Sequence, residues 1–191
     1  MRRFTATVET NLIAIGAARR AMEVAGDHDF AIIANLAQFI DLFTLDFTFV
    51  AMDHSREGQK WRQGLYGRIV SLMIVECLED FGELLGKTLR TTLVALKYNP
   101  NVLTTLGEIH GDLNQLRTKH EAAMREIRNN VFGHRDLNAS RQLEVMANLD
   151  RSRLVRAQQD LMTWLLRLQE FMGTVTTPLP GYVKSRRLGR A

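Results

Sequence analysis

The sequence predicts an all-α fold, a bundle of about five to six helices followed by a flexible basic tail. Apolar residues recur at spacings of three and four along most of the 191-residue chain, which is the period of one helix face. All three prolines lie at or after residue 100, so the first half of the chain can form long helices. We therefore expect one helical domain over residues 1–175 and a tail over residues 176–191.

Two helices are predicted on either side of Gly26. Residues 5–24 carry an apolar stripe, and the glycine supplies a stop. Asp27, His28 and Asp29 then offer an N-cap for the second helix. This second helix is apolar on nearly every face, which is typical of a central position in a bundle.

The end of the second helix is less regular. Apolar and polar residues alternate over residues 43–49, which is the period of a strand. No partner strand is visible elsewhere in the chain, so we predict a helix here, followed by a polar connector over residues 52–58. From there to about Leu96 we expect one long helix, or two with a break near Gly82 or Gly86.

The second half of the chain begins with a predicted turn over residues 99–101, with Asn101 as a natural N-cap. The next helix carries a regular apolar stripe over residues 103–131. We expect a short helix over residues 138–148 and a last long helix capped by Asp150. The tail that follows is basic. Its arginines could contact nucleic acid, but we expect a solvated, disordered tail.

Composition fits a soluble protein and permits an RNA partner without demanding one. Hydrophobic residues make up 46% and charged residues 24% of the chain, both ordinary values for a globular protein. The formal net charge is +4, a mild basic bias. Arginine supplies most of the positive charge, and its planar guanidinium suits bidentate contacts with phosphate.

Several features indicate a cytoplasmic protein without a membrane association. The start of the chain shows no sustained apolar core, so we expect no signal peptide. Residues 30–52 come nearest to a membrane span, but each of Asp41 and Asp46 would cost roughly 2.5–3.5 kcal/mol near a bilayer centre. The single cysteine, Cys77, excludes an intramolecular disulfide and is expected to be a buried, inert thiol.

Residues suited to catalysis gather in RTKHEAAMREIRNNVFGHRD, residues 117–136. Arg128 falls beside the apolar stripe near the end of this helix, and Asn129 follows it. Gly133 can turn the chain so that His134 folds back beside Arg128. The histidine could then transfer protons, and the arginine could stabilise charge on a phosphoryl oxygen, so that a ribose 2′-hydroxyl attacks its neighbouring phosphate without a metal. The same residue types also simply end helices, which is the alternative interpretation.

The segment IRNNVFGHRD, residues 127–136, resembles the signature of the HEPN superfamily: an arginine, a polar residue, and a histidine after four to six intervening positions. It is most similar to the abortive-infection-type branch, in which a helix ends in a phrase like RNKVFAHRD. The resemblance implies a helical bundle that forms a homodimer with two motifs facing each other. Many members are metal-independent endoribonucleases of toxin–antitoxin or phage-defence systems. By position, Arg128 and His134 would be catalytic and Asn129 supporting.

Two positions depart from the patterns of the superfamily. Gly133 stands where this branch often has alanine, and Asp136 stands where another branch has a tyrosine. Some members have also lost activity and only bind. The alternative function is therefore a non-catalytic helical module that dimerises and binds a nucleotide or RNA within a defence or regulatory complex. The resemblance also allows an antitoxin or defence partner.

Further expectations concern the residues around this motif. Glu76 is either the additional acid that some members place near the arginine or a solvated or salt-bridged helix acid. It belongs to an acidic stripe that would ordinarily be a solvated face, formed by Glu76, Glu79, Asp80 and Glu83. Glu121 can pair with Arg125 at i,i+4, and His120 is expected to be a satisfied interface histidine. The other histidines have no ligand-spaced companions, so we expect no metal and no cofactor.

Overall fold

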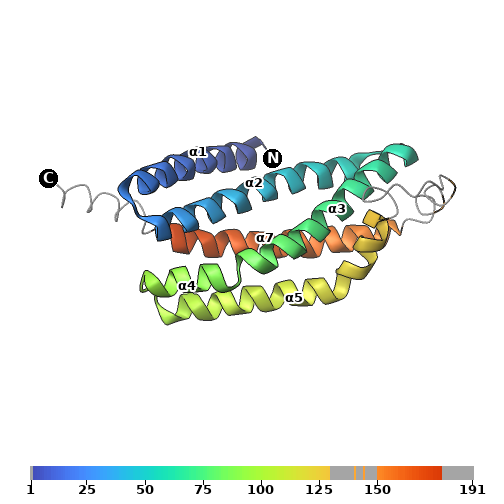
Figure 1. Cartoon of the computed structure of the whole chain (residues 1–191). Coiled ribbons are helices and arrows are strands. Elements are labelled where there is room, and N and C mark those ends of the chain that lie inside the picture. Colours follow the sequence, from blue (N-terminus) through green and yellow to red (C-terminus); the bar gives the residue numbers. More distant parts are fainter. Residues whose placement is uncertain (1, 130–139, 141–143, 145–149, 178–191) are drawn as a thin grey trace. The chain divides into compact units, whose positions relative to one another are not determined.

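The structure is a computed structural model that describes residues 2–129, 140, 144 and 150–177 (Figure 1). Over these residues the regular secondary structure is entirely helical, which confirms the all-α class. The helices follow in the order α1 (Arg2–Ala25), α2 (His28–Arg56), α3 (Lys60–Leu84), α4 (Lys87–Ala95), α5 (Pro100–Arg128) and α7 (Arg151–Thr176). Helix α7 includes Thr176, the first residue of the predicted tail, and residues 178–191 of that tail lie outside the described residues. Most of the short helix predicted over residues 138–148 also lies outside them.

Helix α2 continues through the segment in which apolar and polar residues alternate, as predicted. Thr44 shows why the alternation does not indicate a strand: its hydroxyl donates a hydrogen bond to the Ile40 carbonyl one turn earlier, at 2.8 Å. The polar connector predicted over residues 52–58 is wrong in its first part, because α2 extends to Arg56. Polar residues fit the last turns of a helix as well as they fit a loop, so their composition alone does not mark the end.

The structure also defines the break between α3 and α4 and the start of α5. The break between α3 and α4 falls at one of the two predicted places, with Gly86 as the N-cap of α4. The N-cap of α5 is Asn99, so the prediction of Asn101 is wrong. The Asn99 side-chain oxygen accepts a hydrogen bond from the Asn101 backbone N–H at 2.9 Å. Pro100 takes the first helical position, where its missing N–H costs nothing.

Gly26 ends α1 in the left-handed conformation, with φ of 74°. Its N–H donates to the Glu23 carbonyl at 3.1 Å, and the N–H of Asp27 donates to the Met22 carbonyl at 2.9 Å. This pair of bonds is a Schellman motif, which satisfies carbonyl groups that the helix end would leave unpaired. The glycine stop predicted from the sequence is therefore confirmed.

Alanine at Gly26 is expected to lower the free energy of unfolding by about 1–2 kcal/mol, because an L-residue is strained in the left-handed conformation. The matched control is Gly107→Ala inside α5, which should raise it by up to about 1 kcal/mol through helix propensity. A Cβ at either position would meet no atom within 4 Å, so packing contributes to neither difference. Urea unfolding followed by circular dichroism measures both changes. Shifts of the same sign would contradict this account of Gly26.

The chain divides into two compact units. Unit 1 comprises residues 1–45, 84–109 and 165–191, and unit 2 comprises residues 46–83 and 110–164. In unit 1, α1 runs beside the N-terminal part of α2 (Figure 1), where the Arg19 side chain donates a hydrogen bond to Asn35 at 2.7 Å. The single domain predicted over residues 1–175 stays a prediction.

Helix α2 is long and apolar enough to cross a membrane by length and composition, although half of its most apolar window is buried inside the protein. Core helices of soluble proteins pass the same test. In unit 1, Asp41 of this helix accepts a hydrogen bond from the Gln169 side chain of α7 at 2.8 Å. Burial raises the pKa of Asp41, and the bond from Gln169 partly opposes that rise. Such polar contacts are compatible with a soluble protein.

The core of unit 2 centres on aromatic and branched side chains. Phe81 of α3 is fully buried and meets Trp164 of α7 edge to face, with ring centroids 5.5 Å apart. Cys77 is buried as predicted, and its pKa is raised first by burial and then by the charge of Asp80. The thiol is therefore protonated and unreactive at neutral pH.

His54 is a buried titratable group of unit 2 that no sequence pattern indicated. Its ring Nδ1 lies 3.1 Å from the Gln158 side-chain nitrogen of α7. Burial lowers the pKa of His54, with a smaller opposing effect from the Gln158 hydrogen bond and a further lowering by Arg151. The folded protein therefore takes up this proton at a lower pH than the unfolded chain does.

Stability is consequently expected to fall in mild acid. The contribution of neutral His54 is fully present above the unfolded pKa of about 6.5 and is lost as the pH falls from there toward the folded pKa. The urea midpoint of the wild type should drop between about pH 7.5 and about pH 5.5. The drop should be smaller in His54→Gln and unchanged in the surface control His28→Gln. An equal drop in all three proteins would show that other groups cause it.

Candidate functional site

The predicted site lies at the C-terminal end of α5, in unit 2. Of its three residues the structure describes Arg128, the last residue of the helix, and Asn129, which is exposed. His134 and the Gly133 turn lie outside the described residues. The predicted approach of His134 to Arg128 therefore stays a prediction.

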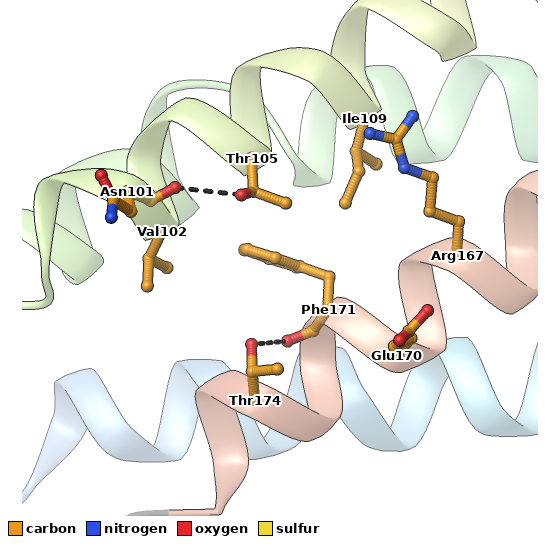
Figure 2. Close-up of a pocket in the computed structure, with 8 residues that line it drawn as sticks. All are labelled: Asn101, Val102, Thr105, Ile109, Arg167, Glu170, Phe171 and Thr174. Carbon is orange, nitrogen blue, oxygen red and sulfur yellow. Dashed lines mark hydrogen bonds between the residues drawn. The ribbon is translucent and has the colours of Figure 1, made fainter.

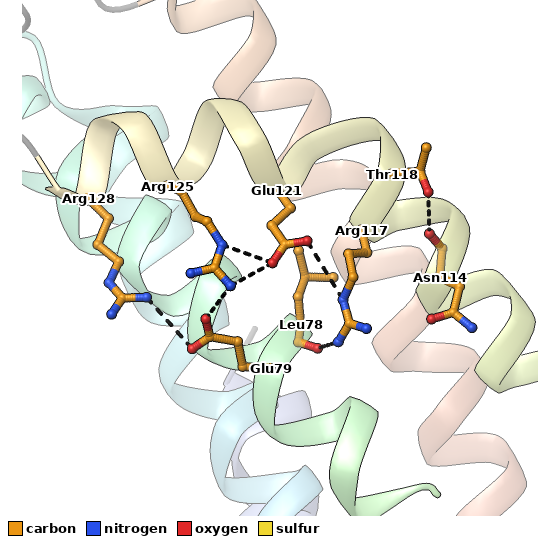
Figure 3. A network of polar contacts seen from close by, with 8 residues as sticks. All are labelled: Leu78, Glu79, Asn114, Arg117, Thr118, Glu121, Arg125 and Arg128. Atoms are coloured by element: carbon orange, nitrogen blue, oxygen red, sulfur yellow. Dashed lines mark hydrogen bonds and ion pairs between the residues drawn. The ribbon is translucent and has the colours of Figure 1, made fainter.

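Arg128 is held on one edge by two acids of α3. Its Nη1 lies 3.8 Å from a carboxylate oxygen of Glu76 and 3.7 Å from one of Glu79, the acid drawn in Figure 3. Both distances are too long for hydrogen bonds, and Nη1 is buried without a hydrogen-bond partner. The arginine side chain as a whole is 26% exposed. Glu76 is thus a salt-bridged acid near Arg128, which agrees with both interpretations of it from the sequence.

Arg125, one turn earlier on α5, contacts the same acid. Its Nη2 lies 2.5 Å from the other oxygen of Glu79. Its Nε and Nη2 also donate to one oxygen of Glu121, at 2.9 and 2.7 Å, which confirms the i,i+4 pair predicted from the sequence. The Glu121 hydrogen bonds raise the pKa of Arg125, so its guanidinium is permanently charged.

Arg117 anchors the other end of this network. Its Nε lies 3.8 Å from Glu121, and its Nη2 donates to the Leu78 carbonyl of α3. The guanidinium occupies the space beside Gly82, where a Cβ would lie 2.6 Å from Nη2. We call this set the arginine cluster. It joins three cations of α5 to three acids, and its members are Arg117, Arg125, Arg128, Glu76, Glu79 and Glu121.

Several N–H groups of the arginine cluster have no acceptor in the part of the chain that the structure describes. Among the described residues, no hydrogen bond or ion pair engages Nε or Nη2 of Arg128, or Nη1 of Arg125. A guanidinium that is held on one edge and open on the other can bind a phosphate group through its remaining N–H groups. The geometry therefore permits phosphate recognition at the end of α5.

Sequence reasoning missed the part played by Glu79, which was expected to lie on a solvated acidic face. Glu79 instead bridges Arg125 and Arg128. The available signal was the spacing: Glu76 and Glu79 are three residues apart, as are the two arginines, so each pair shares one face of its helix. Only the packing of α3 against α5 shows that these faces meet.

A second polar cluster in unit 2 joins α5 to Asp160 of α7. His120 is buried, as predicted for a satisfied histidine, and its Nε2 lies 2.8 Å from a carboxylate oxygen of Asp160 on α7. Lys119 donates to the same oxygen at 2.7 Å. Lys119 and then His120 lower the pKa of Asp160. The described residues include no group of three or more His, Cys, Asp or Glu that could hold a metal ion.

A pocket of about 390 Å³ lies in unit 1, between the start of α5 and the end of α7 (Figure 2). Its lining consists of Asn101, Val102, Thr105, Ile109, Arg167, Glu170, Phe171 and Thr174. Both threonine hydroxyls donate to backbone carbonyls of their own helices, and Arg167 pairs with Glu108 at 2.9 Å. The pocket shares no residue with the arginine cluster.

Comparison of the chain with protein-family models, with curated proteins and with solved structures found no match. The HEPN resemblance therefore rests on residues 127–136. What the geometry adds to it is the environment of Arg128, whose Nη1 is buried near two acids while no hydrogen bond or ion pair engages its Nε or Nη2 among the described residues.

Proposed function

We propose that the chain is a cytoplasmic, metal-independent endoribonuclease of HEPN type, acting as a homodimer in a toxin–antitoxin or phage-defence system. One observation carries the proposal. Arg128 stands at the end of α5, held by Glu76 and Glu79 on one edge, and begins the motif that continues to His134. A fixed guanidinium with free donors is what charge stabilisation at a phosphate requires.

The proposed reaction is a transesterification within the RNA strand. The ribose 2′-oxygen loses its proton and bonds to the adjacent phosphorus, and the bond from phosphorus to the 5′-oxygen breaks. His134 transfers protons, as the base at the 2′-hydroxyl or the acid at the leaving 5′-oxygen. Arg128 stabilises the charge that grows on the phosphoryl oxygens, and the exposed Asn129 amide positions the phosphate. The products carry a 2′,3′-cyclic phosphate and a 5′-hydroxyl.

The test is cleavage of RNA by the purified full chain in excess chelator. Messenger, transfer and ribosomal RNA are incubated with the wild type and with His134→Ala, and the product ends are identified by mass spectrometry. We expect cleavage by the wild type alone, with 2′,3′-cyclic phosphate ends. Intact RNA of all three classes after incubation with the wild type would refute the proposed activity.

A non-catalytic helical module is the second candidate, and the charge balance of the arginine cluster favours it. Three arginines face three carboxylates, so the cluster as a whole carries no net charge to attract RNA. Such a matched network is sufficient to hold α3 against α5 without a ligand. Expression in a host cell separates the candidates: an active toxin arrests growth and Arg128→Ala relieves the arrest, whereas a module leaves growth unchanged in both cases.

A further inference from the structure

We propose that Arg125 is a second phosphate-binding residue, so that Arg125 and Arg128 bind two phosphate groups of one RNA strand. The proposal rests on the proposed function, because it extends the same site along its substrate. It assigns to Arg125 a role in binding and leaves the chemistry to Arg128 and His134.

The contacts of Arg125 present its guanidinium to solvent in a fixed orientation. The side chain is 41% exposed. Glu121 holds its Nε and Nη2 through two hydrogen bonds to one oxygen, and among the described residues no hydrogen bond or ion pair engages Nη1. A side chain that is already ordered loses less conformational entropy when it binds, so this arginine is suited to recognition.

Glu79 places the two guanidiniums side by side (Figure 3). One carboxylate oxygen lies 2.5 Å from Arg125 and the other lies 3.7 Å from Arg128. Two arginines three residues apart on a helix have neighbouring positions on its surface, and their like charges repel. A carboxylate between them offsets that repulsion and keeps both in place. Arg117 differs, because its guanidinium is committed to the Leu78 carbonyl.

The neutral charge of the cluster does not prevent phosphate binding. The Glu79 side chain is 37% exposed, so its ion pairs contribute little to stability in water. An RNA phosphate can therefore replace Glu79 at an arginine N–H group or share that group with it. Each guanidinium has five N–H donors, and the acids engage only one edge of each. Phosphate and carboxylate can therefore occupy different edges of the same arginine.

The experiment measures binding of a single-stranded 2′-O-methyl RNA, which lacks the attacking hydroxyl, between about 50 and about 200 mM salt. Each lost phosphate contact should reduce the slope of log Kd against log salt concentration by about 0.7. We expect this reduction in Arg125→Gln and in Arg128→Gln. Arg125→Lys, which keeps the charge, should retain the slope. The matched control is Arg62→Gln in unit 2, whose side chain is 63% exposed and pairs with Glu57 outside the cluster.

The outcomes separate this proposal from the proposed function. If the wild type cleaves RNA while Arg125→Gln keeps the wild-type slope, Arg125 has no phosphate contact and only this proposal fails. If the wild type binds with the expected slope differences but cleaves nothing, the enzymatic function fails and the second phosphate site stands. An equal slope reduction in Arg62→Gln, or no binding by the wild type at the lowest salt, would overturn the proposal. Circular dichroism of each variant verifies that it is folded.

Discussion

Alanine at Arg128 is expected to reduce the rate of RNA cleavage by about 10²–10³-fold, the usual effect of removing one group that stabilises transition-state charge. His134→Ala should cost about 10²–10⁴-fold, as for the loss of a general acid or base. If the two side chains act on one phosphate, the double variant should be little slower than the slower single variant, because residues that act as a unit are not additive.

Single-turnover cleavage in chelator measures these rates, with Arg62→Ala as the control for loss of one positive charge. Its side chain is exposed and lies outside the arginine cluster, so its rate should match the wild type. Removing Arg128 also leaves Glu76 and Glu79 without one of their cations. Urea unfolding should therefore accompany the kinetics. A variant that is folded and cleaves at the wild-type rate would exclude Arg128 from catalysis.

Alanine at Phe81 is expected to lower the free energy of unfolding by about 3–5 kcal/mol. The ring is fully buried in unit 2 and meets Trp164 edge to face, so truncation leaves a cavity and removes an aromatic contact. The matched control is Phe49→Ala on α2, where the phenylalanine is 41% exposed and the change should stay within about 0.5 kcal/mol. The urea midpoint measures both. Similar losses at the two positions would contradict this assignment of the core.

The helices could be predicted from the sequence because their signal is local and repeated. Apolar spacing identified the segments, and Glu121 with Arg125 could be paired because both lie on one helix. The ends of the helices were harder to predict from the sequence. The sequence placed a connector where α2 continues to Arg56 and placed the cap of α5 at Asn101 instead of Asn99. Polar side chains suit a last turn, a cap and a loop almost equally.

The candidate site could be proposed from the sequence only in part. Arg128, Asn129 and His134 follow one another in a short motif, so a resemblance could single them out together as candidates. The bridge from Glu79 to Arg125 joins residues 46 positions apart in the sequence and depends on which faces of α3 and α5 meet. The burial of His54 against Gln158 depends on packing in the same way. The spacing of residues shows which of them share a face of one helix. It does not show which other helix packs against that face.

The arrangement of the arginine cluster on α5 depends on Gly82, an uncharged residue of α3, because the Arg117 guanidinium occupies the space beside it. Alanine there would favour the helix by up to about 1 kcal/mol, yet its methyl group would push the Arg117 guanidinium away from the Leu78 carbonyl. Glu121, which also holds Arg125, would lose the support of Arg117. The substitution would then raise the helix propensity of α3 while it removes contacts that fix the arginine side chains of α5. Screening for stability alone would therefore favour a substitution that loosens the arginines.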